Sequence, residues 1–386
     1  MTNPALASTP VQRLLSLDVL RGITMAFMIM VSNNGGPGSW GFMHHAAWNG
    51  LTPADLVFPT FVFVVGASIV FAFDTRMARG ASHAEMAWHT FRRAGILFLL
   101  GIVANGFPFF NLVHLRIYGV LQRIAFCYLL AGLFYLWDKR VWTKIAAIGA
   151  LLVGYWVLLR LVPVPGAGMP ARDIAFLDPD QNLVAWLDRQ IFPYRLYEDF
   201  TTHNLRDSEG LLSNLPAVAT VLIGLLAGLW LRSGRAAKTK TFGLVLGAVT
   251  CLGSGYLWSV WFPLNKKMWT SSYVLVAAGW SLAVLALVFW AVEQKDWRRG
   301  WTWPWLVFGS NSIVAYMFGG LFPAALRAAY SHAIGKPQGQ PTHAVGNMFS
   351  GIPYPGLAAF AYSVSCTAVC FIPVWALYRK KIFVKV

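Results

Sequence analysis

Long runs of apolar residues dominate the chain, and short polar segments separate them. A helix needs about 20 mostly apolar residues to cross the hydrocarbon layer of a bilayer. Backbone groups in lipid must be satisfied within the segment, so runs of this length predict helices. Ten such runs lie near residues 16–33, 54–74, 91–108, 117–137, 142–162, 213–232, 241–262, 271–292, 304–327 and 356–378. The pattern predicts an all-α, polytopic integral membrane protein with about ten transmembrane helices.

The charges between the runs predict an orientation with both ends inside the cell. If the N-terminus is cytoplasmic, the cytoplasmic loops hold most of the Lys and Arg residues, while the first outer loop, 34–53, holds none. This is the positive-inside pattern of a multi-pass membrane protein. The long segment 164–212 carries both signs of charge, as long translocated loops do. The outer loop near 263–270 departs from the pattern with Lys266 and Lys267, which suggests a specific role for them.

Composition agrees with a membrane protein and narrows the function. Hydrophobic residues make up 57% of the 386 residues and charged residues only 12%, against about 25% charged in soluble domains. The net charge of +16 is explained by orientation in the membrane, so nucleic acid is not expected as a partner. The four cysteines lie in apolar stretches without metal-ligand spacing, so neither disulfides nor a metal site are expected.

The chain is expected to form one transmembrane domain over residues 1–386. Residues 1–12 would be a short cytoplasmic tail and 164–212 a long periplasmic loop. The first apolar run contains Asp18 and Arg21 and lacks a small-residue cleavage site behind it. It therefore predicts a membrane helix rather than a cleavable signal peptide.

The segment after the first apolar run concentrates candidate chemistry. It carries Asn34, His44, His45, Asn49 and Asp55 at the predicted outer face, behind a glycine-proline run that breaks the helix. A histidine can take a proton near neutral pH or accept an acyl group. An asparagine amide can donate to a developing oxyanion. The same residues also fit a solvated loop without a catalytic role.

Two further positions place charge at membrane depth. Asp18 and Arg21 are three residues apart, so they share one helix face. They form either a structural pair near the cytoplasmic surface or a functional one. Arg123, in G-V-L-Q-R, requires an acidic or phosphate partner. That partner is either a buried carboxylate, Asp55 or Asp18, or an anionic ligand.

The remaining polar segments have simple structural interpretations as well. Asp207 and Glu209 precede an apolar run, where they would cap a helix. The lysines at 266 and 267 would hold an acidic ligand or meet anionic lipid headgroups. Asn311 and Tyr316 would join helices through hydrogen bonds. No P-loop, GxGxxG, HExxH or GxSxG motif is present in the sequence.

Several of these segments together resemble one known family. R-L-L-S-L-D-V-L-R-G, H-A-A-W-N-G-L-T-P-A-D-L-V-F-P, G-V-L-Q-R, E-G-L-L-S and N-K-K-M-W-T-S-S-Y stand in the same order as in heparan-α-glucosaminide N-acetyltransferases. The resemblance runs from about residue 13 to the C-terminus. It is closest to the bacterial branch, some members of which are linked to N-acetylglucosamine use and described as transporters.

The resemblance implies transfer of an acetyl group from cytoplasmic acetyl-CoA to the amino group of a glucosamine on the opposite side. It places the catalytic histidine at His45, which precedes A-x-W-N-G, and an essential asparagine at Asn34. Asp55 would orient His45. The imidazole would act either as a base towards the amine or as a carrier of the acetyl group, and the sequence leaves both routes open.

The resemblance also suggests where the two substrates bind. The phosphates of CoA need cations, for which the candidates are Arg21, Arg92, Arg93, Arg123 and Lys240. The candidate sugar contacts are Trp48, Asn49, Glu209, Asn265 and Lys266. The lysosomal member has an additional N-terminal domain, so a smaller amino sugar than polymeric heparan is expected here. No metal is expected, and a homodimer is left open.

Two other functions remain as alternatives. One is an amino-sugar permease, although such transporters often have broken helices in matching positions. The sequence shows a Gly/Pro interruption after the first helix without a mate. The other is an O-acyltransferase that modifies envelope glycans.

Overall fold

The computed structural model describes residues 14–36, 38–193, 195–197, 205–298, 300–333, 349 and 351–384. Within these residues the regular elements are helices, and the β-pairing consists of isolated bridges such as that between Val164 and Gly168. In chain order the elements are α1 (Leu15–Ser32), η1 (Gly41–Met43), α2 (Pro53–Met77), α3 (His83–Gly106), α4 (Val120–Trp137), α5 (Val141–Leu161), α6 (Leu183–Ile191), α7 (Asn214–Arg232), α8 (Ala237–Ser259), α9 (Ser271–Phe289), η2 (Trp290–Gln294), α10 (Thr302–Ser310), α11 (Ser312–Ala333) and α13 (Pro355–Arg379).

The predicted fold class, an all-α polytopic membrane protein, is confirmed. Nine helices in the described part of the chain are long and apolar enough to cross a bilayer. The tenth predicted run, 91–108, falls in α3, which begins earlier, at His83, and carries Glu85, Arg92 and Arg93 in its first half. The orientation of the bundle stays a prediction, and the predicted tail 1–12 lies outside the described residues.

The prediction of one continuous helix over 304–327 was wrong, because the segment breaks at Asn311 into α10 and α11. Asn311 has a non-helical backbone, with φ −128° and ψ 48°. Its amide donates to the carbonyl of Ile382 at 3.1 Å and accepts from the N–H of Val384 at 2.8 Å. The break is thus tied by a side chain to the C-terminal segment. The predicted loop 164–212 also differs, since it contains helix α6.

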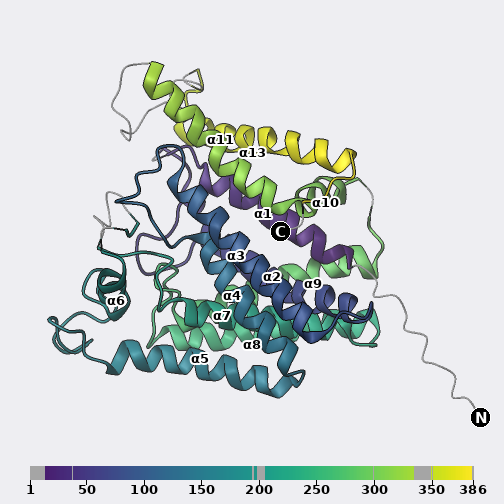
Figure 1. The fold of residues 1–386 in the computed structure, drawn as a ribbon, viewed down its shortest axis with the longest axis horizontal. Helices are drawn as coiled ribbons and strands as arrows, with labels where there is room; N and C mark the ends of the chain where they lie inside the picture. The colour runs from purple at the N-terminus through teal and green to yellow at the C-terminus, as the bar shows by residue number, and fades with distance from the viewer. Residues whose placement is uncertain are drawn as a thin grey trace, which may run out of the picture.

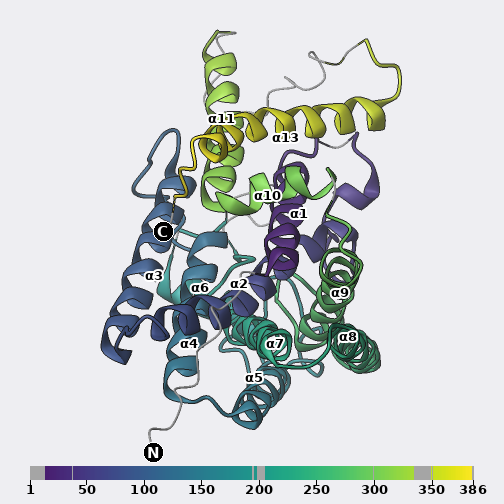
Figure 2. The same cartoon turned by 90° about the vertical axis from the view of Figure 1, so that its right-hand side faces the viewer.

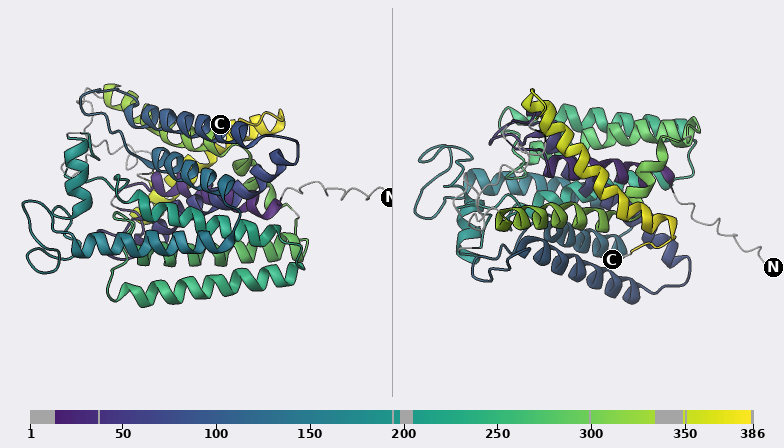
Figure 3. Two further views of the ribbon diagram at one scale, coloured as in Figure 1. Left: turned by 60° about the horizontal axis from the view of Figure 1, so that its bottom comes forward. Right: turned by 90° about the horizontal axis from the view of Figure 1, so that it is seen from above.

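The helices run side by side in neighbouring pairs (Figures 1 and 3), with α2 beside α7, α3 beside α4 and α8 beside α9. Figure 2 shows α1, α10, α11 and α13 gathered on one side, away from α5, α7 and α8. Helix α6 lies at one end of the bundle rather than within it. This arrangement makes α2 a central element with neighbours on several sides.

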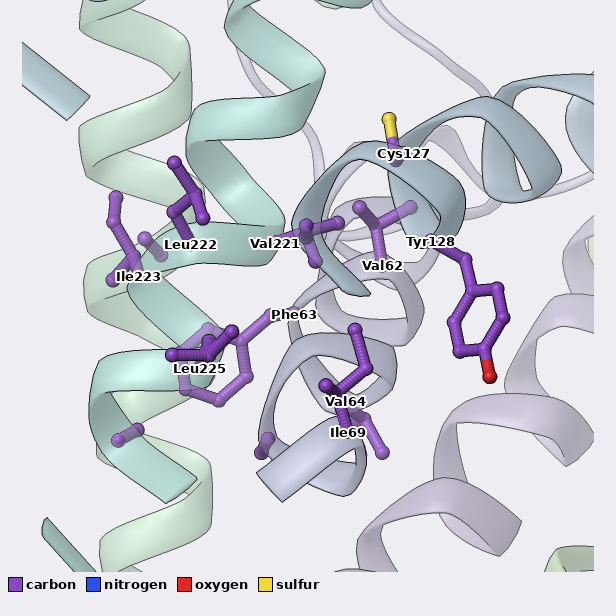
Figure 4. Close-up of a cluster of buried hydrophobic side chains, with 14 of the residues drawn as sticks. Val62, Phe63, Val64, Ile69, Cys127, Tyr128, Val221, Leu222, Ile223 and Leu225 are labelled. Carbon is purple, nitrogen blue, oxygen red and sulfur yellow. The ribbon is translucent and has the colours of Figure 1, made fainter. Parts of the chain in front are cut away.

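A buried apolar cluster between α2, α4 and α7 holds α2 in place (Figure 4). Two glycines make the α2–α7 contact close. A Cβ on Gly66 would lie 2.0 Å from the carbonyl oxygen of Val221, and one on Gly224 would lie 2.0 Å from that of Phe63. Small residues at such contacts let helix backbones approach in lipid. Larger side chains at either glycine would push the helices apart and displace the ends of α2.

Helix α2 connects the two regions that matter for function. Asp55 stands in its first turn and Arg76 in its last. At 1.5 Å per residue, they are separated by about 30 Å along the helix, which matches the thickness of the hydrocarbon layer. We call the region that holds His45 and Asp55 the His45 end. The region at the last turn of α2, which holds Arg76, is the Arg76 end.

Candidate active site

A histidine and a buried carboxylate form a pair at the His45 end. Nδ1 of His45 lies 2.9 Å from Oδ1 of Asp55; the histidine side chain is 45% exposed and the aspartate 1%. The other carboxylate oxygen accepts from the backbone N–H groups of Ala46 and Thr52, both at 3.1 Å. Thr52 and Asp55 form the capping box of α2, where the helix dipole favours a negative charge. The carboxylate is therefore fixed before any substrate arrives.

Further contacts fix the backbone around this pair. The hydroxyl of Tyr273 donates to the backbone carbonyl of Asp55 at 2.6 Å, and that of Thr52 donates to the carbonyl of His44 at 2.7 Å. A carboxylate on one imidazole nitrogen leaves the other nitrogen for a reacting group. The nitrogen left for a reacting group is Nε2 of His45, which lies 3.1 Å from Nζ of Lys266. The ring of His44 instead shares a hydrogen bond with the hydroxyl of Ser39 at 2.6 Å.

A lysine ammonium stands directly at the pair. Nζ of Lys266 lies 3.0 Å from Nδ1 and 3.1 Å from Nε2 of His45, and 3.6 Å from Oδ1 of Asp55. Burial lowers the pKa of Lys266, while the charges of Asp55 and Glu209 act in the opposite direction. Lys266, one of the two lysines that depart from the positive-inside pattern, is thus part of the His45 site.

Two asparagines join the loop of Lys266 to the loop of His45. The side-chain amide of Asn265 donates to the Asn49 side chain at 3.1 Å, and the Gly50 N–H donates to the Leu264 carbonyl at 2.8 Å. The oxygen of the Asn265 side chain accepts from the Met268 N–H at 2.8 Å. Both ends of the Asn265 amide are engaged within the protein.

The prediction that Asp207 and Glu209 cap a helix was wrong, because both carboxylates bind Arg116. Nε of Arg116 donates to Asp207 at 2.8 Å, and the same guanidinium pairs with Glu209. Burial alone would raise the pKa of Glu209, but the charges of Arg116, Arg123 and Lys266 hold it below its usual value. A buried, charge-compensated cluster therefore lies next to Lys266.

Arg123 belongs to this end of the molecule as well. It is fully buried, donates to the carbonyl of Ser208 at 3.2 Å and to the hydroxyl of Ser213, and lies 4.7 Å over the ring of Trp269. Arg123 makes these contacts instead of the predicted ion pair with Asp55 or Asp18. Its Nε and Nη1 atoms have no hydrogen-bond partner within the described part of the chain.

Asn34 and Trp48, the other predicted residues of the outer loop, are held by hydrogen bonds to the protein backbone. Asn34 accepts from the Gly36 N–H at 3.1 Å and donates to the Met43 carbonyl at 3.4 Å, two residues before His45. The indole N–H of Trp48 donates to the Leu177 carbonyl at 2.8 Å, and its ring faces Arg206. Asn34 thus supports the turn that precedes the histidine.

A cavity of about 670 Å³ extends into the bundle from the Arg76 end, between α1, α2, α3, α4, α11 and the C-terminal segment. The acid in its lining is Asp18, which pairs with Arg21 at 3.1 Å. Its deeper wall is apolar. The basic residues of the lining are Arg21, Arg76, Arg79, His89, Arg92 and Arg93. A volume of this size accommodates a drug-sized ligand or cofactor, and the excess of guanidinium groups suits phosphates.

The cavity brings together three of the five predicted CoA contacts. Arg21, Arg92 and Arg93 line it, whereas Arg123 lies at the His45 end. Lys240 lies on α8, where its carbonyl accepts from the indole of Trp230. The apolar depth followed by a basic mouth fits a ligand with an uncharged arm and a phosphorylated head. The residues present therefore fit acetyl-CoA as a substrate.

The cavity and the His45 pair are close but separate. On α2 the deepest lining residue is Phe61 and on α1 it is Met28. Each is six residues from the corresponding site residue, Asp55 and Asn34, or roughly 9 Å at helical rise. Tyr316 of α11 lines the cavity as well.

The sequence interpretation missed residues at both ends. Arg76 and Arg79 line the cavity but were not among the predicted CoA contacts. Arg116 departs from the positive-inside pattern in the same way as Lys266, and this was a usable signal. Asp188 of α6 gave no signal; it is 1% exposed and accepts from the Leu211 N–H at 2.9 Å. Within the described residues no group of His, Cys, Asp or Glu could hold a metal ion.

The profile of the family "Heparan-alpha-glucosaminide N-acetyltransferase, catalytic" matches residues 13–259, which is more than half of the chain. The chain belongs to this family. The predicted family resemblance is thereby confirmed, and the His45 pair, the E-G-L-L-S segment and the cavity wall formed by α1–α4 all fall within the matched region.

Two mammalian relatives agree with this assignment. The heparan-α-glucosaminide N-acetyltransferase of Homo sapiens is 29% identical over 97% of this chain and 60% of the relative. That of Mus musculus is 24% identical over 99% of this chain and 62% of the relative. The chain thus spans about three fifths of the length of these members of the heparan-α-glucosaminide N-acetyltransferase family.

Proposed function

We propose that this protein is a transmembrane N-acetyltransferase, an acyltransferase that moves an acetyl group from acetyl-CoA to the amino group of a glucosamine-type sugar. The observation that carries the proposal is the placement of two features along α2. The His45–Asp55 pair stands at one end, and the arginine-lined cavity opens at the other, about 30 Å away. This layout suits a donor and an acceptor that approach from opposite sides of a membrane.

Family membership and the cavity support acetyl-CoA as the donor. The arginines at the mouth would bind its phosphates, with Arg21, Arg92 and Arg93 as predicted contacts and Arg76 and Arg79 beside them. The acetyl end would enter the apolar depth and reach His45 across the short barrier beyond Phe61 and Met28. Under this proposal the Arg76 end faces the cytoplasm, in a bacterial inner membrane, and the outer segment 164–212 faces the periplasm.

His45 would act on the amine at the other end. A glucosamine ammonium is not nucleophilic until it loses a proton, and an exposed imidazole held by Asp55 can accept that proton. The alternative is attack of His45 on the thioester, followed by transfer of the acetyl group to the sugar. Asn34 would polarise the thioester carbonyl in either route. The predicted sugar contacts are Trp48, Asn49, Glu209, Asn265 and Lys266.

The charged cluster suggests how a cationic sugar is received. Asp55 and Glu209 place negative charge near the exposed imidazole, where Lys266 and Arg116 compensate it until a cationic sugar binds. Glu209 pairs with Arg116, and both the oxygen and the nitrogen of the Asn265 side chain already form hydrogen bonds within the protein. These two residues would therefore shape the sugar site rather than bind the sugar through unused hydrogen-bonding groups. The exposed Asn49 and the ring of Trp48 stand nearer the surface.

A transfer assay with the purified protein tests the proposal. Acetyl-CoA with a labelled acetyl group is incubated with glucosamine, and the product is identified by mass spectrometry. N-acetylglucosamine is the expected product, formed by the native chain and not by His45→Ala. An ester product would indicate the O-acyltransferase alternative instead. Absence of any transfer, with acetyl-CoA bound, would remove the enzymatic proposal.

One structural observation favours the permease alternative. The break at Asn311 interrupts one predicted helix and separates α10 from α11. Interrupted helices are typical of transporter sites. Uptake of labelled glucosamine into vesicles without acetyl-CoA would support this alternative.

A further inference from the structure

The side chain nearest to the reactive nitrogen of His45 is itself a primary amine. Nζ of Lys266 lies 3.1 Å from Nε2 of His45, a hydrogen-bond distance at which the ammonium can pass a proton directly to the imidazole. Its chemistry is that of the proposed acceptor, because lysine and glucosamine both present an ammonium that becomes nucleophilic on losing a proton. If His45 takes a proton from the amine of a sugar, it can therefore also take one from the amine of Lys266.

We propose that Lys266 is a self-acetylation site, modified at Nζ by acetyl-CoA when no sugar acceptor is present. This inference rests on the proposed function, since it uses the same donor and the same histidine. The backbone of the Lys266 loop is held beside the His45 loop through the Asn49–Asn265 and Gly50–Leu264 hydrogen bonds. The effective concentration of its amine is that of a fixed neighbour.

The reaction balances without a further reagent. The Lys266 ammonium loses one proton to His45, and the free amine attacks the thioester carbonyl carbon. The new C–N bond forms as the C–S bond breaks. Of the two protons that the ammonium loses in total, one ends on the sulfur of CoA and the other in solvent. If the acetyl group first resides on His45, the same amine attacks it, and the C–N bond to the imidazole breaks instead.

The surroundings of Lys266 act in both directions, and on balance its pKa lies below its usual value. Burial is the largest cause and favours the free amine, whereas the charges of Asp55 and Glu209 favour the protonated form. Acetylation removes the positive charge, so Asp55 loses a cation at 3.6 Å and the cluster acquires an uncompensated negative charge. The modified protein would therefore be less active, and a sugar bound at His45 would protect Lys266 by taking the acetyl group first.

Peptide mass spectrometry tests the inference, with Lys267 as a matched control in the same loop. The purified full-length chain is incubated with acetyl-CoA, with and without glucosamine, and acetyl occupancy is measured at both lysines. Without glucosamine, occupancy at Lys266 should exceed that at Lys267 at least about tenfold, given its fixed proximity. In His45→Ala it should fall to the level of Lys267, while the elution volume of the protein stays unchanged. Glucosamine should lower the occupancy at Lys266.

Each contrary result has a distinct meaning. An unmodified Lys266 in a preparation that acetylates glucosamine overturns the inference and leaves the proposed function intact. Equal acetylation of both lysines, or acetylation independent of His45, also overturns it, because the reaction is then uncatalysed. If neither glucosamine nor Lys266 is acetylated while acetyl-CoA binds, the proposed function fails together with the inference.

Discussion

The two ends of α2 both hold charge inside an apolar bundle, but they hold it in opposite ways. At the His45 end, acids and bases alternate and compensate one another: Lys266 with Asp55, and Arg116 with Asp207 and Glu209. At the Arg76 end, five arginines line a cavity with one acid, Asp18.

This difference indicates what each end is suited to do. Compensated buried charges are held rigidly and suit proton transfer and orientation. An excess of positive charge around a cavity suits an anionic ligand, because the ligand supplies the missing negative charge. The His45 end is therefore suited to the chemical step and the Arg76 end to binding of the donor. A substitution at one end should affect one of these steps and leave the other nearly unchanged.

The largest expected effect is at the His45 end. His45→Ala should lower kcat for acetyl transfer by about 10²- to 10⁴-fold, the usual contribution of an acid–base group. The side chain is 45% exposed, so the fold should survive. Binding of acetyl-CoA, measured by calorimetry, should stay within about twofold of the native value. A parallel loss of acetyl-CoA binding would contradict the separation of the two ends.

The next effect is at the Arg76 end. Arg92→Ala together with Arg93→Ala should weaken acetyl-CoA binding by about ten- to a hundredfold, since each removes a charge-assisted contact with phosphate. The weaker binding should appear mainly as a higher KM for acetyl-CoA, with a much smaller change in kcat. Lys240→Ala provides the control, because Lys240 lies away from the cavity wall. Equal effects in both variants would argue against the cavity as the donor site.

The third effect concerns the pH dependence of stability at the His45 end. Burial, together with the charge of Asp207, raises the pKa of Asp188 from 3.8 to about 7, although the Leu211 N–H and nearby arginines oppose this. The folded state then binds the proton more tightly than the unfolded state. Stability should fall as pH rises through the window from about 4 to 7, by at most roughly 4 kcal/mol, and level off above it.

Asp188→Asn offers the direct check on this pH dependence, because the amide has a similar shape and cannot ionise. Melting temperatures in detergent should fall less between pH 5 and pH 8 in the variant than in the native chain. Identical slopes for the two proteins would mean that Asp188 does not titrate in this range.

The smallest effect is expected at the break between α10 and α11. Asn311→Ala removes two hydrogen bonds to the C-terminal segment, each worth about 1 kcal/mol. Phe383 and Val384 of that segment line the cavity, so KM for acetyl-CoA should rise a few-fold. Ser312→Ala, next to the break, is the comparison variant. A larger change in kcat than in KM would place Asn311 closer to the chemistry than the structure does.

The sequence predicted the bundle well because apolar length decides which segments cross a membrane. It failed at Asn311, because a side-chain contact with residues 382 and 384, about seventy positions away, replaces the helical backbone there. Hydropathy carries no information about such a contact. The boundary of α3 was misplaced as well, because its first half carries Glu85, Arg92 and Arg93 and does not form an apolar run.

The candidate site likewise has a part that the sequence predicted and a part that depends on long-range packing. His45, Asn34 and Asp55 are close in sequence, so the family motifs brought them to attention together. The contact of Lys266 with His45 spans 221 positions and arises only from the packing of the α8–α9 loop onto the α1–α2 loop. Arg116 and Asp188 contribute through similar long-range packing. The departure from the positive-inside pattern at Lys266 was noted from the sequence, and the departure at Arg116 could have been found in the same way.

Transfer across a sealed vesicle tests the central claim most directly. The protein is reconstituted, labelled acetyl-CoA is enclosed on the side of the Arg76 end, and glucosamine is supplied only on the side of the His45 end. We expect labelled N-acetylglucosamine on the glucosamine side with the native chain and none with His45→Ala. Product formed only when donor and acceptor share one side would contradict a donor cavity and an acceptor site at opposite ends of α2.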